Sequence, residues 1–203
     1  MDVFTGVTRG TGRRFCAALM TVIFSVGFVC PASWAIEADT LPVNGQIVAG
    51  AGEIAQTAGQ MTVTQRTDRM VATWDSFNIG RDAGVAFVQP SSSSVALNRI
   101  NDLLPSQIFG RLTANGQVFL LNSAGIIFGD SAQVDVGGIV ASSLNISDEN
   151  FLAGQYVFEK GSAAGDILNG GTIRTADGGY VAFLSPHIVQ EGSIQANGGD
   201  IVL

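Results

Sequence analysis

The sequence predicts an all-β protein that folds as a right-handed parallel β-helix. The chain has 203 residues, of which 46% are hydrophobic and 13% charged, a composition typical of a chain with a packed core. Glycine is unusually frequent, at 26 residues. Similar segments also recur about 20 residues apart, which suits one turn of a β-solenoid and is too short for helical repeats.

The first element is residues 1–35, which we expect to be a secretory signal peptide. Arginines precede a run without charge, and small side chains lead up to a cleavage site after Ala35. The alternative is an uncleaved anchor, because the uncharged run is long enough to span a membrane. Cleavage removes Cys16 and Cys30 and leaves 7 basic and 16 acidic residues, a net charge of −9. A chain without cysteine suits an export route on which it stays unfolded and uncrosslinked.

Repeats make up much of the remaining chain. Residues 170–184 have a near copy at 192–203 and a more distant relative at 110–121. Each copy joins a short β segment, an Asn-Gly or Asp-Gly corner and an apolar β segment. Asn and Gly tolerate positive φ, so these corners are sharp.

Short segments rich in Val, Ile and Phe, bounded by Gly or Asn, are the predicted strands. In a solenoid the turns stack about 4.8 Å apart. We expect apolar side chains such as Phe119 to point inwards, and Thr, Gln and Asp to meet water. A sandwich of hairpins is the competing all-β fold, but it needs turn signals roughly every 8–12 residues, which the copies do not show. The expected strands are residues 61–65, 85–89, 118–121, 126–128, 133–136 and 180–184.

Three stretches interrupt the coil. Ser147 as an N-cap, acidic residues after it and Gly154 at the end predict one short helix over 147–154. Residues 90–94 and 101–106 are expected loops. All three are interpreted as excursions from one domain.

A succession of motifs carries a family resemblance. The chain resembles the filamentous-haemagglutinin N-terminal domain, also called the two-partner-secretion or haemagglutination activity domain, over roughly residues 43–190. The family's Asn-Pro-Asn-Gly-Ile box stands here at 122–126 with Ser for Pro and Ala for the second Asn, and the Asn-Pro-Asn-Leu box is absent. The motifs are Trp74-Asp75-Ser76-Phe77-Asn78-Ile79-Gly80, Val85-Ala86-Phe87-Val88-Gln89-Pro90, Ala96-Leu97-Asn98-Arg99-Ile100, Ser106-Gln107-Ile108-Phe109-Gly110, and the run from Ala114 to Gly129.

The resemblance implies a single-stranded, pectin-lyase-like solenoid with an N-terminal cap and short extra-helical β elements. It places the secretion domain at residues 36–190 and the start of a further, truncated repeat at 191–203. It also implies a role at the front of a large exported adhesin, a virulence factor of a Gram-negative bacterium. Such a chain crosses the inner membrane through the Sec machinery. The POTRA modules of a dedicated outer-membrane barrel then recognise it in the periplasm, and it folds at the cell surface.

The resemblance assigns transporter recognition to the motif residues. The same residues also have purely structural interpretations, which stay open: a corner or a stack for Asn98 and Asn122, a backbone corner for Gly125, and the core for Trp74 and Phe77. The candidate recognition residues are Asn122, Ser123, Ala124, Gly125, Ile126, Asn98, Arg99, Trp74, Phe77 and Asn78.

Two other classes of protein are alternatives. A β-helical polysaccharide-degrading enzyme needs clustered carboxylates in a groove, and the only close acidic pair is Asp148-Glu149 in the expected helix. An autonomous surface-binding solenoid needs a regular face of threonines, which the sequence lacks. A lone His187 cannot share a metal, and an acidic chain poor in lysine does not suit nucleic acid. We therefore expect no catalysis, metal or cofactor, and expect host-cell glycans or receptors to bind a downstream region.

Overall fold

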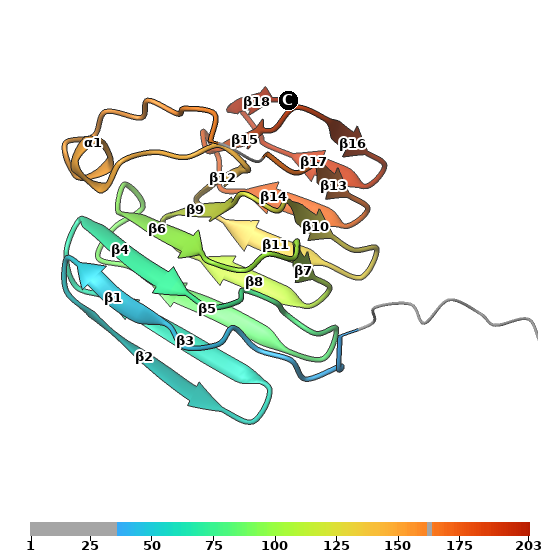
Figure 1. Ribbon diagram of the computed structural model, residues 1–203, viewed down its shortest axis with the longest axis horizontal. Coiled ribbons are helices and arrows are strands. Elements are labelled where there is room, and N and C mark those ends of the chain that lie inside the picture. Colours follow the sequence, from blue (N-terminus) through green and yellow to red (C-terminus); the bar gives the residue numbers. More distant parts are fainter. Residues whose placement is uncertain (1–35, 162–163) are drawn as a thin grey trace, which may run out of the picture. The chain divides into compact units, whose positions relative to one another are not determined.

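A computed structural model describes residues 36–161 and 164–203, and in it the chain winds into a solenoid with three sides (Figure 1). Each side is one sheet, and apart from the first strand of two of the sheets, neighbouring strands come from successive turns and run parallel. The prediction of an all-β parallel β-helix is confirmed. The expected signal peptide and its cleavage site after Ala35 lie outside the described residues.

The three sheets share the strands as follows. Sheet 1 holds β1 (Gln46–Ala49), β4 (Arg69–Trp74), β6 (Val95–Ile100), β9 (Gln117–Asn122), β12 (Gly138–Ser142), β15 (Tyr180–Leu184) and β18 (Asp200–Val202). Sheet 2 holds β7 (Ser106–Ile108), β10 (Ile126–Phe128), β13 (Ile167–Asn169) and β16 (Ile188–Gln190). Sheet 3 holds β2 (Gly52–Thr57), β3 (Gln60–Gln65), β5 (Gly84–Val88), β8 (Arg111–Ala114), β11 (Gln133–Val136), β14 (Thr172–Thr175) and β17 (Ser193–Gln195). One pass over the sides is one turn, so the parallel strands make six turns.

The sequence repeats stack directly on one another. Thr172 of β14 lies beside Ser193 of β17, and Tyr180 of β15 lies beside Asp200 of β18. The third relative at 110–121 contributes β8 and β9 to the same two sheets. The spacing seen in the sequence is therefore the length of one turn.

Two strands, β1 and β2, close the N-terminal end of the solenoid, and each pairs antiparallel with the first parallel strand of its own sheet. β1 runs antiparallel to β4, and β2 runs antiparallel to β3. Together, β1 and β2 form the cap that the resemblance implied. At the other end, β16, β17 and β18 are the edge strands of their sheets.

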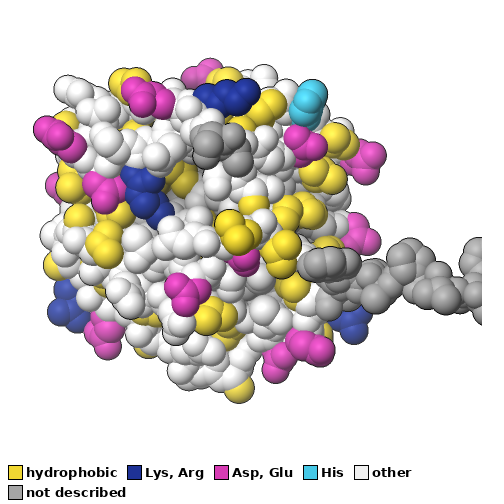
Figure 2. Space-filling model, viewed as in Figure 1, with side chains coloured by type: hydrophobic (Ala, Val, Ile, Leu, Met, Phe, Trp, Pro, Cys, Tyr) yellow, Lys and Arg dark blue, Asp and Glu magenta, His cyan; other side chains and the backbone are white. Residues whose placement is uncertain are grey.

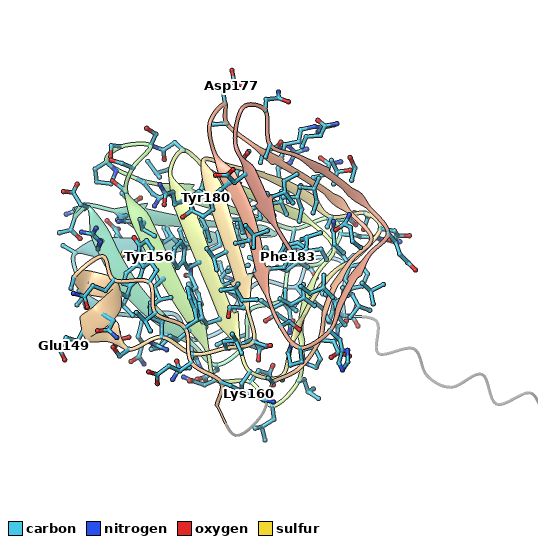
Figure 3. The ribbon with its side chains drawn as sticks, turned by 90° about the horizontal axis from the view of Figure 1, so that it is seen from above. Glu149, Tyr156, Lys160, Asp177, Tyr180 and Phe183 are labelled. Atoms are coloured by element: carbon cyan, nitrogen blue, oxygen red, sulfur yellow. The ribbon has the colours of Figure 1, made fainter. Side chains whose placement is uncertain are left out.

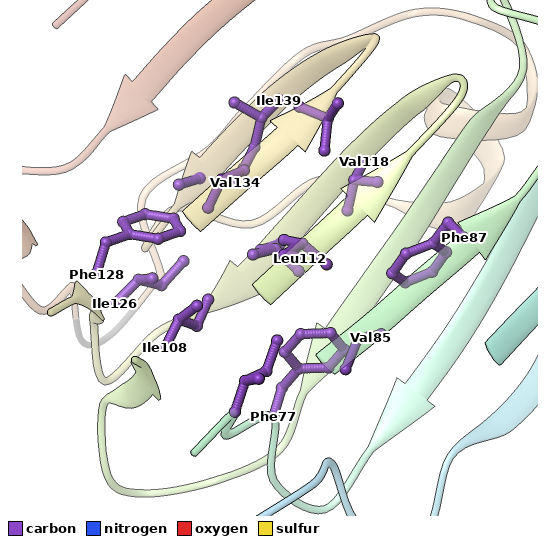
Figure 4. Packing of buried hydrophobic residues seen from close by; sticks show 14 of the residues in the cluster. Phe77, Val85, Phe87, Ile108, Leu112, Val118, Ile126, Phe128, Val134 and Ile139 are labelled. Carbon is purple, nitrogen blue, oxygen red and sulfur yellow. The ribbon is translucent and has the colours of Figure 1, made fainter. Parts of the chain in front are cut away.

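The interior is filled by apolar side chains from all three sheets (Figure 4). On sheet 3 the expected alternation holds: in β11, Val134 and Val136 are buried, whereas Gln133 is exposed and Asp135 is half-buried. Across the interior, the rings of Phe128 on sheet 2 and Phe183 on sheet 1 stack nearly parallel, with centroids 5.9 Å apart.

Sheet 1 departs from the expected alternation, because its outer face is also buried. Residues 144–160, which we call the strap, leave the coil after β12 and cover this face (Figures 1 and 3). The prediction that Phe119 points inwards is wrong. Its neighbours Val118 and Leu120 belong to the interior core, and Phe119 packs on the opposite face of β9 with Phe151 of the strap.

The strap contains the expected helix, α1 (Asp148–Leu152). The Ser147 side chain accepts a hydrogen bond from the Asn150 backbone N–H at 3.1 Å, as an N-cap does. Gly154 follows the helix with a φ of 74°, which permits the sharp exit. Residues 90–94 and most of 101–106 are loops, as predicted.

Candidate functional site

The motif residues gather along sheet 1 and along the corner that leads from sheet 1 to sheet 2. Trp74 ends β4 and is fully buried, and its ring meets Phe77 edge-on with centroids 5.2 Å apart. Trp74 Nε1 donates a hydrogen bond to Asn98 Oδ1 at 3.0 Å. Asn98 is also fully buried, and its Nδ2 donates to the Phe119 carbonyl oxygen at 3.2 Å. One amide thus satisfies the indole and a backbone group of the next turn, in a place where an unpaired polar atom is costly.

Asn122 ends β9 and organises the next corner. Its Oδ1 accepts from the Ala124 backbone N–H at 2.9 Å, and its own carbonyl oxygen accepts from the Gly125 N–H at 3.0 Å. Its Nδ2 donates to the Leu104 carbonyl oxygen and to Ser106 Oγ, each at 3.0 Å. Asn122 therefore shapes its own turn and fastens the corner of the preceding turn.

Position 125 requires a glycine for two reasons, its backbone conformation and the lack of room for a side chain. Its φ is 111°, and a Cβ atom placed on it would lie 2.5 Å from the Asp166 carbonyl oxygen. Because side chains rarely adopt this φ, glycine is needed at the point where β10 begins. The interpretation of Gly125 as a backbone corner matches this geometry.

Arg99 is the motif residue that reaches outside the solenoid. It starts from the outer face of β6, and its Nε donates to Asp148 Oδ1 at 2.7 Å. Its two terminal nitrogens donate to Asn145 Oδ1 at 2.6 Å and to the Ile146 carbonyl oxygen. Arg99 thus ties the strap to sheet 1.

The remaining candidates divide between the interior and the surface. Ile126 is part of the core, and Asn78 Oδ1 accepts from the Gln107 backbone N–H at 2.7 Å, which joins two successive corners. Ser123 is exposed and Ala124 half-buried at the tip of the corner. A hollow of about 310 Å³ lies beside Ser123, with Arg99 in its wall.

An amide ladder at the corner from sheet 3 to sheet 1, in which Gln65 and Gln89 are buried and Asn115 is exposed, was not predicted. Gln89 Nε2 donates to Gln65 Oε1 at 3.0 Å, and the Gln89 backbone exchanges two hydrogen bonds with the side chain of Asn115, at 2.7 and 2.8 Å. The three residues occupy successive turns where sheet 3 leads to sheet 1. Their spacing of 24 and 26 residues, close to one turn, is the signal that could have revealed them.

The Tyr180 hydroxyl is a titratable group that lies partly buried beneath the strap. Burial raises the pKa of the Tyr180 hydroxyl above its ordinary value, and nearby Tyr156 raises it further. The Tyr180 hydroxyl donates to Gln117 Oε1 at 2.7 Å. The Tyr180 ring packs against the apolar cluster beneath the strap.

Charged side chains are scattered over the surface, and some form exposed ion pairs such as that of Arg66 with Glu53. Figure 2 shows acidic side chains spread over one face without a common centre. Among residues 36–161 and 164–203, no three His, Cys, Asp or Glu side chains are placed to hold a metal ion. His187 is exposed beside β16. In the same part of the chain, no helix is both long and apolar enough to cross a bilayer.

The fold and the motif geometry define a parallel β-solenoid protein whose signature asparagines and glycine build its corners. The family model described as "TPS secretion domain" matches residues 35–203. The chain belongs to this two-partner-secretion family, as the motif succession indicated.

Known relatives agree with this membership. The chain is 33% identical over 177 residues to a heme/hemopexin-binding protein of Haemophilus influenzae strain Rd, a match that covers 80% of this chain and 19% of that protein. A second heme/hemopexin-binding protein of the same species is 36% identical over 115 residues, covering 57% of this chain and 12% of that protein. The chain thus spans less than a fifth of the length of these relatives.

A solved structure shows the same architecture. The crystal structure of the HMW1 secretion domain from Haemophilus influenzae matches with a TM-score of 0.75 and 31% identity, over 79% of this chain and 44% of that chain. The parallel solenoid described above is therefore the fold of this solved secretion domain as well.

Proposed function

We propose that this chain is the non-catalytic secretion domain of a large exported adhesin, and that a POTRA-bearing outer-membrane barrel recognises it in the periplasm before it folds. Membership of the two-partner-secretion family carries the proposal. The curated relatives are several times longer than the matched region, which supports a role at the front of a long exoprotein. In this proposal residues 191–203 begin a further repeat, and the exoprotein reaches the surface of a Gram-negative bacterium.

Burial of the motif residues supports recognition of the unfolded chain. Asn98, Asn122 and Trp74 have no exposed surface in the folded solenoid, so a transporter cannot read their side chains there. In the unfolded chain they are all accessible. An extended segment rich in β-forming residues also suits strand addition to the edge of a POTRA sheet.

The difference between the two ends of the solenoid supports folding that proceeds from the N-terminus outwards. The antiparallel β1 and β2 close one end. β16, β17 and β18 each offer an unpaired backbone edge on which a next turn can form. Each turn that folds outside the cell prevents that part of the chain from moving back through the barrel. Folding itself therefore drives export in one direction without a periplasmic energy source.

A binding experiment with isolated POTRA modules tests recognition. The chain is presented either folded or freshly diluted from urea, and binding is followed by a surface-based assay. We expect the unfolded chain to bind and the folded chain neither to bind nor to compete. Tight binding of the folded chain contradicts recognition before folding. Secretion with and without the co-expressed barrel tests the wider proposal, which fails if export does not depend on the barrel.

A matched pair of variants tests the motif itself. Asn122→Ala removes a motif asparagine, and Asn169→Ala removes one outside the motif that is equally buried and also accepts from the backbone N–H two residues on. If the motif is read, Asn122→Ala weakens binding of the unfolded chain and Asn169→Ala does not. If the two variants change binding of the unfolded chain equally, both asparagines have only a structural role in the solenoid. Recognition by other residues is then judged from the binding of the unaltered chain.

A further inference from the structure

The strap covers a continuous row of apolar side chains on the outer face of sheet 1. Strand register places Val71, Leu97, Phe119, Val140 and Ala182 side by side on β4, β6, β9, β12 and β15. The first four of these side chains are at most 4% exposed. They lie outside the solenoid, so the strap, and not the coil, keeps them from water.

Aromatic rings form the underside of the strap. Phe119 meets Phe151 and Tyr156 edge-on, with ring centroids 5.7 and 5.0 Å apart, and Phe158 lies 6.4 Å away. Ile146 and Phe151 are each at most 1% exposed. These contacts are apolar and come apart without breaking a strand pairing.

The backbone of the strap closes on itself. Asn145 and Glu159 exchange two backbone hydrogen bonds, of 2.9 and 2.8 Å, which join its two ends. Between them, residues 147–157 bond to one another, through α1 and the turn from Asn150 to Gln155. Two side chains of sheet 1 make polar contacts with the strap. Arg99 holds Asn145, Ile146 and Asp148 together, and Ser142 Oγ bonds to the backbone of Leu144, where the strap leaves β12.

We propose that the strap opens and closes as one unit on a solenoid that stays folded, and that Arg99 is its latch. The strap follows β12 in the chain, so β4, β6, β9 and β12 can pair before it arrives. Until it closes, these four strands present a bare apolar strip. The coil and the strap are therefore separate units of stability, and closing the strap is the step that shields the strip.

Hydrogen exchange by mass spectrometry on the purified chain tests this inference. Arg99→Met removes the latch and keeps the aliphatic stem. Arg66→Met is the matched control, because Arg66 forms an ion pair with Glu53 of 3.2 Å in which both side chains are 65% exposed. We expect Arg99→Met to speed exchange in the strap at least ten-fold, to leave β4, β6 and β9 unchanged, and to increase the fluorescence of an apolar dye. Arg66→Met should change none of these.

Two results overturn the inference. One is exchange that accelerates by the same factor in the strap and in the strands, which makes them a single unit. The other is strap exchange that Arg99→Met leaves unchanged. If Arg99→Met does not fold, Asp148→Asn, which removes the charge on one partner of the latch, decides by the same two criteria.

Discussion

The hydrogen bond between Trp74 and Asn98 makes a sharp prediction, because both residues are fully buried in the middle of the coil. Asn98→Ala removes the acceptor of the indole N–H and the donor to the Phe119 carbonyl oxygen. Neither group can reach water. The variant therefore leaves the buried indole N–H unpaired and creates a small cavity, whereas the Phe119 carbonyl oxygen stays in the strand pairing of β9 with β6.

The magnitude follows from the indole N–H and the cavity. A buried donor left without its partner costs about 1–3 kcal/mol and the cavity adds to this cost, so Asn98→Ala should lower the free energy of unfolding by at least about 1–3 kcal/mol. That is a large part of the roughly 5–15 kcal/mol that stabilises a typical domain. If Trp74→Phe is introduced first, the indole donor is already gone. Asn98→Ala should then cost about 1–3 kcal/mol less, which is the coupling between the two side chains.

Urea unfolding followed by far-ultraviolet circular dichroism measures all four members of this cycle. Asn197→Ala, at an exposed corner, is the control and should change stability by no more than about 0.5 kcal/mol. The reasoning is refuted if Asn98→Ala costs no more than the control, or if its cost is the same with and without the indole.

Three further predictions concern the strap and the corner. Phe119→Ala should lower the free energy of unfolding by about 3–5 kcal/mol in urea titrations, whereas exposed Val88→Ala should barely change it; similar effects would contradict the packing described. Gly125→Ala should cost more than about 1 kcal/mol, because it must adopt a φ of 111° against Asp166, and an unchanged melting temperature would contradict this. The raised pKa of Tyr180 means that the folded state holds this proton more tightly than the unfolded state. Its stabilisation is therefore complete below about pH 10 and declines above it, by at most ~1.4 kcal/mol per pH unit. Unfolding measured across that range should show the decline, and Tyr180→Phe should lessen it; an equal decline in the variant would rule Tyr180 out.

Local sequence signals were strongest where one face of a strand meets water. In β11, Gln133-Val134-Asp135-Val136 alternates, so both the strand and its orientation could be predicted. The corners could also be predicted, because Asn and Gly tolerate the positive φ that a sharp corner needs, and Asn44, Gly178 and Gly198 do have positive φ. The helix in the strap was found from Ser147 and Gly154, which mark its two ends.

The outer face of sheet 1 could not be predicted, because alternation disappears when both faces are buried. All but the first residue of β9 (Gln117–Asn122) are buried, and such a run does not show which side chains face the core. The missing information lies in the strap, some 30 residues further along the chain from Phe119 to Phe151. The partners of Asn98 and Asn122 come from other turns, so the motif could be located in the sequence while its hydrogen bonds could not.

The antiparallel cap restricts how two copies of this protein can meet. At the capped end, β1 and β2 run against the direction of the coil, and among the residues that the structure describes sheet 2 has no strand there. A second copy therefore cannot continue the parallel coil at this end, because its strands would meet neither the right strand direction nor a complete set of three sheets.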